Sequence, residues 1–210
     1  MSARAAIVIS GGGSNMAALL TAMRAPGYPA CCPLVLANNP GAGGLEKAAA
    51  AGVATAVVDH RPFGRDREGF ERALSARIEA AEADLVCLAG FMRLLSPWFV
   101  ARWRDRLINI HPALLPAFRG LHTHERALAA GVALHGCTVH LVREEMDDGP
   151  ILGQGAVRVL AGDTAETLAA RVLAMEHRLY PAALAAFAGG ALRIKDGRLR
   201  GQPLALCAGA

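Results

Sequence analysis

The sequence predicts an α/β fold with an open, mostly parallel twisted sheet and helices on both faces. Short apolar runs rich in Val, Ile and Leu alternate with longer helical stretches, as is typical of parallel strands buried on both faces. Of the 210 residues, 53% are hydrophobic and 19% are charged, so the chain can bury a large core and has no long disordered tail by composition. We therefore expect a single domain over residues 1–210.

The first half of the chain alternates strands and helices. The apolar runs predict strands at residues 5–9, 33–38, 55–59, 84–90 and 106–110. Helical patterns lie between them, at residues 16–23, 45–52, 67–83 and 96–103. Gly52 closes the second of these helices, and Pro97 suits the first turn of the last. This order is the one expected of a parallel sheet.

The last third changes character. Residues 123–131 predict a helix with Thr123 as its N-cap, and residues 136–142 and 151–159 predict two strands. A long helix follows over residues 163–190, with a capping signal at Asp163 and Thr164 and glycines at its end. The chain then predicts a C-terminal hairpin that turns at Asp196-Gly197.

Charge and cysteine usage narrow the function classes. The net charge is +4, but Lys and Arg form no run of five or more, so we expect no nucleic-acid partner, whereas small anionic substrates fit. The five cysteines contain no C-x-x-C pair, and Cys87 and Cys137 lie in apolar runs, which indicates free buried thiols in a reducing compartment. No signal peptide and no apolar run of about 18 residues are evident, so we expect a cytoplasmic protein without a membrane partner.

The stretch "SGGGSN", Ser10 to Asn15, follows the first strand and opens a helix. Glycines let successive backbone N–H groups converge on an anion, and the helix N-terminus adds a partial positive charge. Met16 stands where a dinucleotide fingerprint has its third glycine, and no Gly-Lys-Ser/Thr follows, so neither that fingerprint nor a P-loop fits. The motif predicts a phosphate cradle; a tight turn without ligand is the alternative.

Asn109 and His111 lie at the carboxyl end of a predicted strand, where open α/β sheets bind ligands. Residues two apart on a strand point the same way, so the two side chains form a pair. An amide that stabilises an oxyanion beside an imidazole that moves a proton suits acyl transfer. A structural histidine held by backbone groups is the alternative at this point.

The stretch "REEMDDGPIL", Arg143 to Leu152, places four carboxylates within five residues in a loop between two strands. Crowded like charges favour protonated carboxyls, whereas a nearby imidazolium favours the ionised form. A solvated acidic turn is the alternative interpretation.

Together these motifs resemble the phosphoribosylglycinamide formyltransferases. The resemblance runs from "IVISGGGSN" through "LAGFMRLLSPWFV", "NIHPALLP", "GLHTHERAL", "HGCTVHLV" and "MDDGPIL" to "RVLAMEHRLYP". It implies a Rossmann-like formyltransferase fold, with residues 1–105 as the phosphate-binding half and residues 106–210 as the catalytic and folate-binding half. It also implies that the formyl group of the cosubstrate 10-formyltetrahydrofolate passes to the amine of glycinamide ribonucleotide in de novo purine (IMP) synthesis, leaving tetrahydrofolate.

The resemblance implies site residues position by position. Asn109, His111 and Asp147 are expected to be catalytic, with Asp147 holding His111 as a cation. The glycinamide ribonucleotide site is expected at Gly13, Ser14, Asn15, Leu173, Ala174, Met175 and Glu176. The folate site is expected at Arg67, Met92, Arg93, Leu94, Leu95, Asn109, Arg143, Glu144, Glu145, Met146 and Asp147. Whether His111 acts first as acid or as base stays open.

The chain departs from the family pattern at three positions. Gly12 stands where relatives often carry Asn, Ala113 replaces a small hydroxyl residue, and Asp148 stands where glycine is usual. Two adjacent acids result, and Asp147 takes the catalytic role because it lies three residues before Pro150, as the pattern requires.

Other interpretations fit the sequence less well. The spacing His122-x-His124 with His135 and His140 lacks the usual zinc-ligand pattern, so we expect no metal. A formyltetrahydrofolate hydrolase or a tRNA or sugar formyltransferase usually carries an additional domain. A nucleotide-binding oxidoreductase lacks its third glycine here, and a non-catalytic module would not need Asn109, His111 and Asp147 together. The expected partners are small-molecule substrates, and a homodimer stays open.

Overall fold

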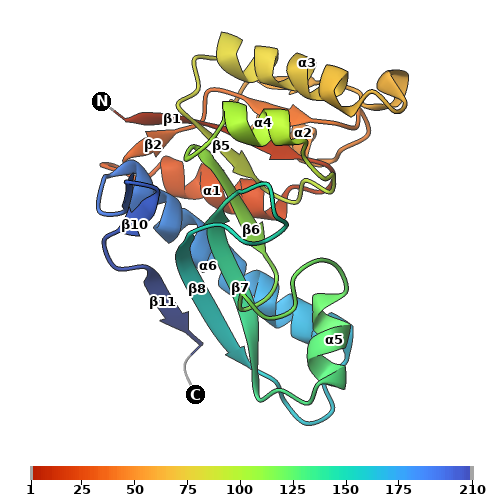
Figure 1. The fold of residues 1–210 in the computed structure, drawn as a ribbon, viewed down its shortest axis with the longest axis vertical. Helices are drawn as coiled ribbons and strands as arrows, with labels where there is room; N and C mark the ends of the chain where they lie inside the picture. Colours follow the sequence, from red (N-terminus) through yellow and green to blue (C-terminus); the bar gives the residue numbers. More distant parts are fainter. Residues whose placement is uncertain (1, 209–210) are drawn as a thin grey trace. The chain divides into compact units, whose positions relative to one another are not determined.

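The computed structural model describes residues 2–208, and the chain divides into two compact units whose boundary in the sequence lies between Asn109 and Ile110 (Figure 1). Strand β6 (Leu107–His111) crosses this boundary, and every other described strand lies within one unit. The strand and helix order agrees with the predicted α/β class, and the sheet is open and mostly parallel.

The first unit is a parallel sheet. Its strands are β1 (Ala3–Ile9), β2 (Ala30–Cys31), β3 (Val35–Ala37), β4 (Thr55–Val57), β5 (Leu85–Leu88) and the start of β6 (Leu107–His111). The pairing order is β6-β5-β1-β3-β4, and β2 pairs with the beginning of β1. From Ala5 to Ile9, β1 is inaccessible to solvent, because helices cover both faces of the sheet.

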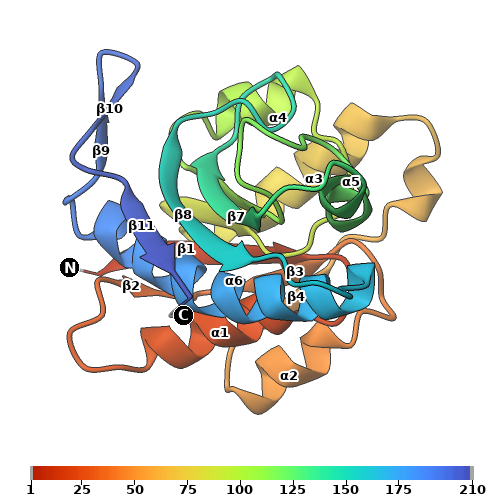
Figure 2. The same cartoon turned by 90° about the horizontal axis from the view of Figure 1, so that it is seen from below.

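The helices of this unit are α1 (Ser14–Met23), α2 (Gly44–Ala50), the 3-10 turn η1 (Arg61–Phe63), α3 (Arg67–Ala80) and α4 (Pro97–Arg102). Figure 2 shows α1 and α2 on one face of the strands and α3 and α4 on the other. Ser96 caps α4 by accepting from Phe99 N–H, and Pro97 takes the first turn, as predicted.

The second unit combines α5 (Thr123–Ala129), β7 (Leu134–Leu141), β8 (Ile151–Arg158), α6 (Ala165–Ala188), β9 (Arg193–Lys195), β10 (Arg198–Arg200) and β11 (Leu204–Cys207). β7 and β8 are antiparallel, with an irregularity between Val139 and His140, and β11 runs parallel to β8. α6 packs along all three strands. Its approach is close: a Cβ at Gly155 of β8 would overlap the Met175 side chain.

Two local predictions about α6 and the C-terminus are confirmed. Thr164 caps α6 in a reciprocal pair with Thr167, each side chain accepting from the other's backbone N–H. The chain turns at Asp196 and Gly197, both with positive φ, between the paired strands β9 and β10.

One capping prediction is wrong. The helix α5 begins at Thr123 itself, and its N-cap is His122, in the left-handed conformation with φ of 57° and no side-chain capping bond. The Thr123 side chain is buried in the core of this unit and does not cap the helix. The strands β2 and β11 and the turn η1 were not predicted, because two to four residues show no periodicity.

Candidate active site

The glycine loop connects β1 to α1. Gly13 has φ of 66°, a left-handed conformation that favours glycine, and it is the N-cap of α1. The loop is fixed from two sides, because Gly44 N–H donates to the Gly11 carbonyl at 3.0 Å and Met92 N–H donates to Ser10 Oγ at 3.0 Å. The predicted cradle is therefore an ordered turn with exposed glycines.

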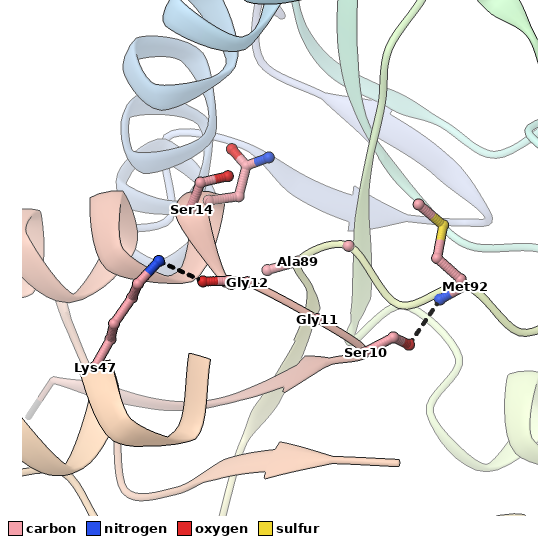
Figure 3. A pocket seen from close by; sticks show the side chains of 10 residues that line it. Ser10, Gly11, Gly12, Ser14, Lys47, Ala89 and Met92 are labelled. Carbon is pink, nitrogen blue, oxygen red and sulfur yellow. Dashed lines mark hydrogen bonds between the residues drawn. The ribbon is translucent and has the colours of Figure 1, made fainter. Parts of the chain in front are cut away.

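A cavity of about 400 Å³ opens over this loop (Figure 3). The predicted residues Gly13, Ser14 and Asn15 line it together with Lys47 of α2. The first turn of α1 has no acidic residue, so the partial positive charge of the helix N-terminus is not compensated by a carboxylate there. Backbone donors, a helix N-terminus and one ammonium group make this cavity suited to an anion. Lys47 is absent from the sequence-based set.

The segment Met92–Leu95 follows β5. The side chains of Met92 and Leu94 are 79% and 59% exposed, which leaves apolar surface available to a ligand. The guanidinium of Arg93 lies 5.4 Å from the centre of the Phe70 ring. Arg67 begins α3 and is exposed, and Phe70 of the same helix makes the contact with Arg93.

A buried carboxylate anchors the end of that segment. Glu71 of α3 is 1% exposed and accepts hydrogen bonds from the backbone N–H of Ser96, at 2.8 Å, and from its hydroxyl. Both bonds join α3 to the residue that caps α4 and immediately follows Leu95. Glu71 was not among the predicted site residues, and no local pattern would have identified it.

Asn109 and His111 lie on the same strand, β6, which extends one residue further than predicted and ends at His111. Asn109 is half-buried and stands opposite Leu88 of β5 in the parallel pair. His111 is 6% exposed. The structure therefore places this predicted pair at the carboxyl end of a central strand, the ligand-binding edge of such sheets.

The second unit brings His111 and Asp147 together. Nδ1 of His111 lies 3.4 Å from Oδ2 of Asp147, and Nε2 lies 3.0 Å from the Phe118 carbonyl oxygen. Asp147 has φ of 54° and also accepts from Gly120 N–H at 2.9 Å. Both ring nitrogens of His111 thus face oxygen acceptors, an arrangement in which the imidazolium can donate from both.

A second imidazole, which sequence reasoning did not select, shares the same carboxylate. Nε2 of His140 lies 3.7 Å from Oδ1 of Asp147, and its Nδ1 lies 3.1 Å from the Leu141 carbonyl. Burial lowers the pKa of His140 below its ordinary value, and the Leu141 carbonyl and Asp147 oppose that shift. Burial therefore favours the neutral form of His140. A histidine inside an otherwise apolar strand was the available signal.

The two adjacent acids have different partners. The side chain of Asp148 pairs with Arg119, and both are about two-fifths exposed. Arg126 of α5 fixes the segment that carries Arg119, because it donates to the carbonyls of Arg119, at 2.6 Å, and Leu121, at 3.3 Å. Asp147 faces imidazoles whereas Asp148 faces a surface arginine, so only Asp147, with a side chain 10% exposed, lies beside His111.

The rest of the acidic loop is largely open to solvent. Glu144, Glu145 and Met146 are exposed, and Arg143 donates to the Val142 carbonyl at 3.0 Å. At the end of the loop, Leu141 N–H of β7 donates to the Pro150 carbonyl at 2.9 Å.

The predicted α6 residues split between two environments. Leu173 and Ala174 are exposed, whereas Met175 and Glu176 are buried. Burial raises the pKa of the Cys137 thiol on β7, and the Glu176 carboxylate raises it further. Met175 packs against Gly155, so its side chain serves the core of this unit and not an open surface.

Two of the four histidines considered for a metal, His124 and His135, contact each other. Nε2 of His135 lies 3.2 Å from Nδ1 of His124, with the rings edge to face. Burial, followed by the neighbouring His124 and His111, lowers the pKa of His135 to about 4. Within residues 2–208, no three His, Cys, Asp or Glu side chains are grouped as metal ligands would be. None of the helices in that range has the length and hydropathy needed to cross a membrane.

Comparison with known proteins gives a consistent result. Residues 3–184 match the model of the family described as formyl transferase. The phosphoribosylglycinamide formyltransferase of Escherichia coli (strain K12) is 43% identical over 190 residues, which cover 90% of this chain and 89% of that protein. The trifunctional purine biosynthetic protein adenosine-3 of Bos taurus is 46% identical over 198 residues, but the chain spans only 20% of its length.

Solved structures agree. The crystal structure of phosphoribosylglycinamide formyltransferase from Brucella melitensis is 57% identical in sequence and superposes with a TM-score of 0.86, covering 90% of this chain and 97% of that one.

Proposed function

The chain belongs to the formyl transferase family, and from this premise we propose that it transfers the formyl group of 10-formyltetrahydrofolate to the amine of N1-(5-phosphoribosyl)glycinamide. The products are the N-formyl nucleotide and tetrahydrofolate, a step of purine biosynthesis. Formyltetrahydrofolate is a cosubstrate, and the five free cysteines fit a reducing, cytoplasmic setting.

The observation that carries the proposal is the contact of Asp147 with His111 at the end of β6. The Asp147 carboxylate, whose side chain is 10% exposed, lies 3.4 Å from the imidazole and orients the ring. His140, whose pKa burial lowers, faces the other oxygen. A protonated imidazole held in this way can donate a hydrogen bond to the oxyanion that develops during acyl transfer.

Formyl transfer balances with these groups. The substrate amine attacks the formyl carbon, the C=O electrons move to oxygen, and the Asn109 amide and His111 donate to that oxyanion. The intermediate then collapses, and the carbon–nitrogen bond to the folate breaks. The amine loses a proton and the folate nitrogen gains one, and His111 carries the proton between them. In the resting structure Nε2 of His111 faces the Phe118 carbonyl, so the formyl oxygen replaces that acceptor.

The two substrates are assigned to different surfaces. The cavity over Gly13, Ser14 and Asn15 suits the phosphate of the nucleotide. The same substrate is assigned to Leu173, Ala174, Met175 and Glu176 of α6, of which only Leu173 and Ala174 are exposed. The folate is assigned to the exposed apolar side chains of Met92 and Leu94, with Arg93, Leu95 and Arg67, and to the acidic loop Arg143, Glu144, Glu145, Met146 and Asp147.

The test is an absorbance assay for tetrahydrofolate with glycinamide ribonucleotide present or omitted. Product that forms only in the presence of the nucleotide supports the transferase. Product that forms equally without it indicates a hydrolase, and no product in either case, with ligands still bound, indicates a non-catalytic binding protein. Mass spectrometry of the N-formyl nucleotide identifies the acceptor.

A further inference from the structure

Lys47 reaches from α2 to the glycine loop. Its ammonium group donates a hydrogen bond of 2.7 Å to the carbonyl oxygen of Gly12, 35 positions earlier in the chain (Figure 3). Of the described residues that line the cavity over the loop, Lys47 has the single charged side chain. Lys47 thus places a positive charge at a cavity that is suited to an anion, and it is hydrogen-bonded to a residue that lines this cavity.

The backbone of α2 is held firmly against the loop at the point from which Lys47 extends. Gly44 N–H donates to the Gly11 carbonyl at 3.0 Å. A Cβ at Gly44 would overlap the Ile9 side chain and lie 3.2 Å from Gly13 Cα, so only glycine permits this approach. Lys47 follows one helical turn later, on a backbone whose position relative to the loop is set.

The carbonyl oxygens of the three loop glycines all accept hydrogen bonds from other groups of the protein. Gly11 O accepts from Gly44 N–H, Gly12 O from Lys47 and Gly13 O from Ala17 N–H. In a trans peptide the C=O and the following N–H point in opposite directions. Holding the Gly12 carbonyl therefore directs the Gly13 N–H to the opposite side of the peptide. Within residues 2–208, the N–H groups of Gly12 and Gly13 have no acceptor.

We propose that Lys47 is the charged residue of the phosphate site. It fixes the Gly12–Gly13 peptide so that the Gly13 N–H points toward the ligand, and it supplies a positive charge to the bound phosphate. An ammonium group has three donors, and the Gly12 carbonyl takes one of them. The assignment rests on the proposed function, because that function names a phosphate ester as substrate. Lys47 acts on nucleotide binding and takes no part in formyl transfer.

The chain supplies a matched control in Arg24. Its guanidinium donates to the Ala51 carbonyl at 2.7 Å, so it too is a long cation bonded to a backbone oxygen between α1 and α2. Arg24 does not line the loop cavity in the described part of the chain. Comparing Lys47→Met with Arg24→Met therefore separates a charge at the phosphate from a charge that only joins two helices.

The experiment measures dissociation constants by calorimetry for glycinamide ribonucleotide and for glycinamide riboside, which lacks the phosphate. Lys47→Met is expected to weaken nucleotide binding by about 10- to 100-fold, the range for a charge-assisted hydrogen bond. Riboside binding and the KM for the folate should change by less than about twofold, the scatter expected of a group that touches neither. Lys47→Arg should recover most of the loss, and Arg24→Met should match the wild type.

Three results would overturn the assignment: nucleotide affinity unchanged in Lys47→Met, equal weakening of nucleotide and riboside, or the same loss in Arg24→Met. Urea unfolding of each variant shows whether the fold is retained. Turnover of the wild-type protein is measured separately. A wild type that binds the nucleotide without transferring formyl contradicts the proposed function, whereas the nucleotide-to-riboside ratio still decides the role of Lys47.

Discussion

The carboxylate of Asp147 lies between two imidazoles, with Oδ2 3.4 Å from Nδ1 of His111 and Oδ1 3.7 Å from Nε2 of His140. One of these rings ends β6 and the other lies within β7, so residues 36 and 7 positions away meet at one acidic loop. The neighbouring Asp148 is instead paired with Arg119. The two acids therefore predict different consequences when they are changed.

Asp147→Asn should lower turnover at pH 7 by about 10²-fold, the low end for a group that supports proton transfer. Asn keeps an acceptor for Gly120 N–H, so the loop should stay folded. A pH–rate profile measures the turnover.

Asp148→Asn is the control for that variant, and its turnover should stay within about twofold of wild type, because exposed ion pairs contribute little. A large loss in Asp148→Asn with a small one in Asp147→Asn would shift the catalytic assignment by one residue. Unchanged profiles in both would make the loop a solvated turn.

His111→Ala and Asn109→Ala should each reduce kcat, by about 10²–10⁴-fold for a proton-transfer group and about 10²–10³-fold for an oxyanion donor. The double variant should lose less than the product of the two, because groups that act on one transition state are not additive. Steady-state kinetics with calorimetric binding of both substrates tests this. Near-wild-type turnover in either single variant removes that residue from the mechanism.

Gly12 and Gly13 should respond differently to a side chain. At Gly12 a Cβ meets nothing within 4 Å, so Gly12→Ala should leave the free energy of unfolding unchanged. At Gly13 the φ of 66° and the Gly44 Cα at 3.0 Å both oppose a Cβ, so Gly13→Ala should cost about 1–2 kcal/mol or more. Urea unfolding compares them. Equal stabilities would contradict the loop geometry.

Glu71→Ala should raise the KM for the folate, because it frees the N–H and hydroxyl of Ser96 at the end of the segment Met92–Leu95. Leaving buried donors unpaired should also cost about 1–3 kcal/mol of stability. Glu79→Ala is the control: Glu79 likewise joins α3 to α4, through Arg102 at 2.9 Å, but does not touch Ser96. The prediction fails if both variants change the folate KM alike, or if neither does.

Stability should depend on the buried histidines. His135 has an ordinary pKa of 6.5 when unfolded and a pKa of about 4 in the folded protein. Between these values the unfolded chain binds a proton that the folded protein does not, so the free energy of unfolding falls as the pH drops from 6.5 to 4. His124, His140 and His177 have pKa values lowered in the same direction and add to the slope.

Urea unfolding from pH 7.5 to pH 4 tests this with His135→Gln, which should flatten the slope in that window. His122 is exposed, so His122→Gln should keep the wild-type slope. If His135→Gln and the wild type have parallel curves, protonation of His135 does not limit acid stability.

Local pattern alone determined a good part of this protein. Continuous apolar runs predicted the parallel strands, because a strand covered on both faces has no polar side to alternate. Thr164, Pro97 and the Asp196-Gly197 turn set element boundaries through bonds within a few residues of themselves. The motif residues Asn109 and His111 also fell at the end of β6 as expected.

Tertiary structure decided what local pattern could not. The bonds of Lys47 to Gly12 and of Glu71 to Ser96, and the approach of His140 to Asp147, join residues that share no periodicity. The strand β11 forms because β8 offers an open edge, and Thr123 is drawn into the core, leaving His122 to begin α5. The local sequence encodes backbone dihedral preferences and the face that will be buried. The hydrogen-bond partner of a buried polar group depends instead on which distant segment the packing brings close to it.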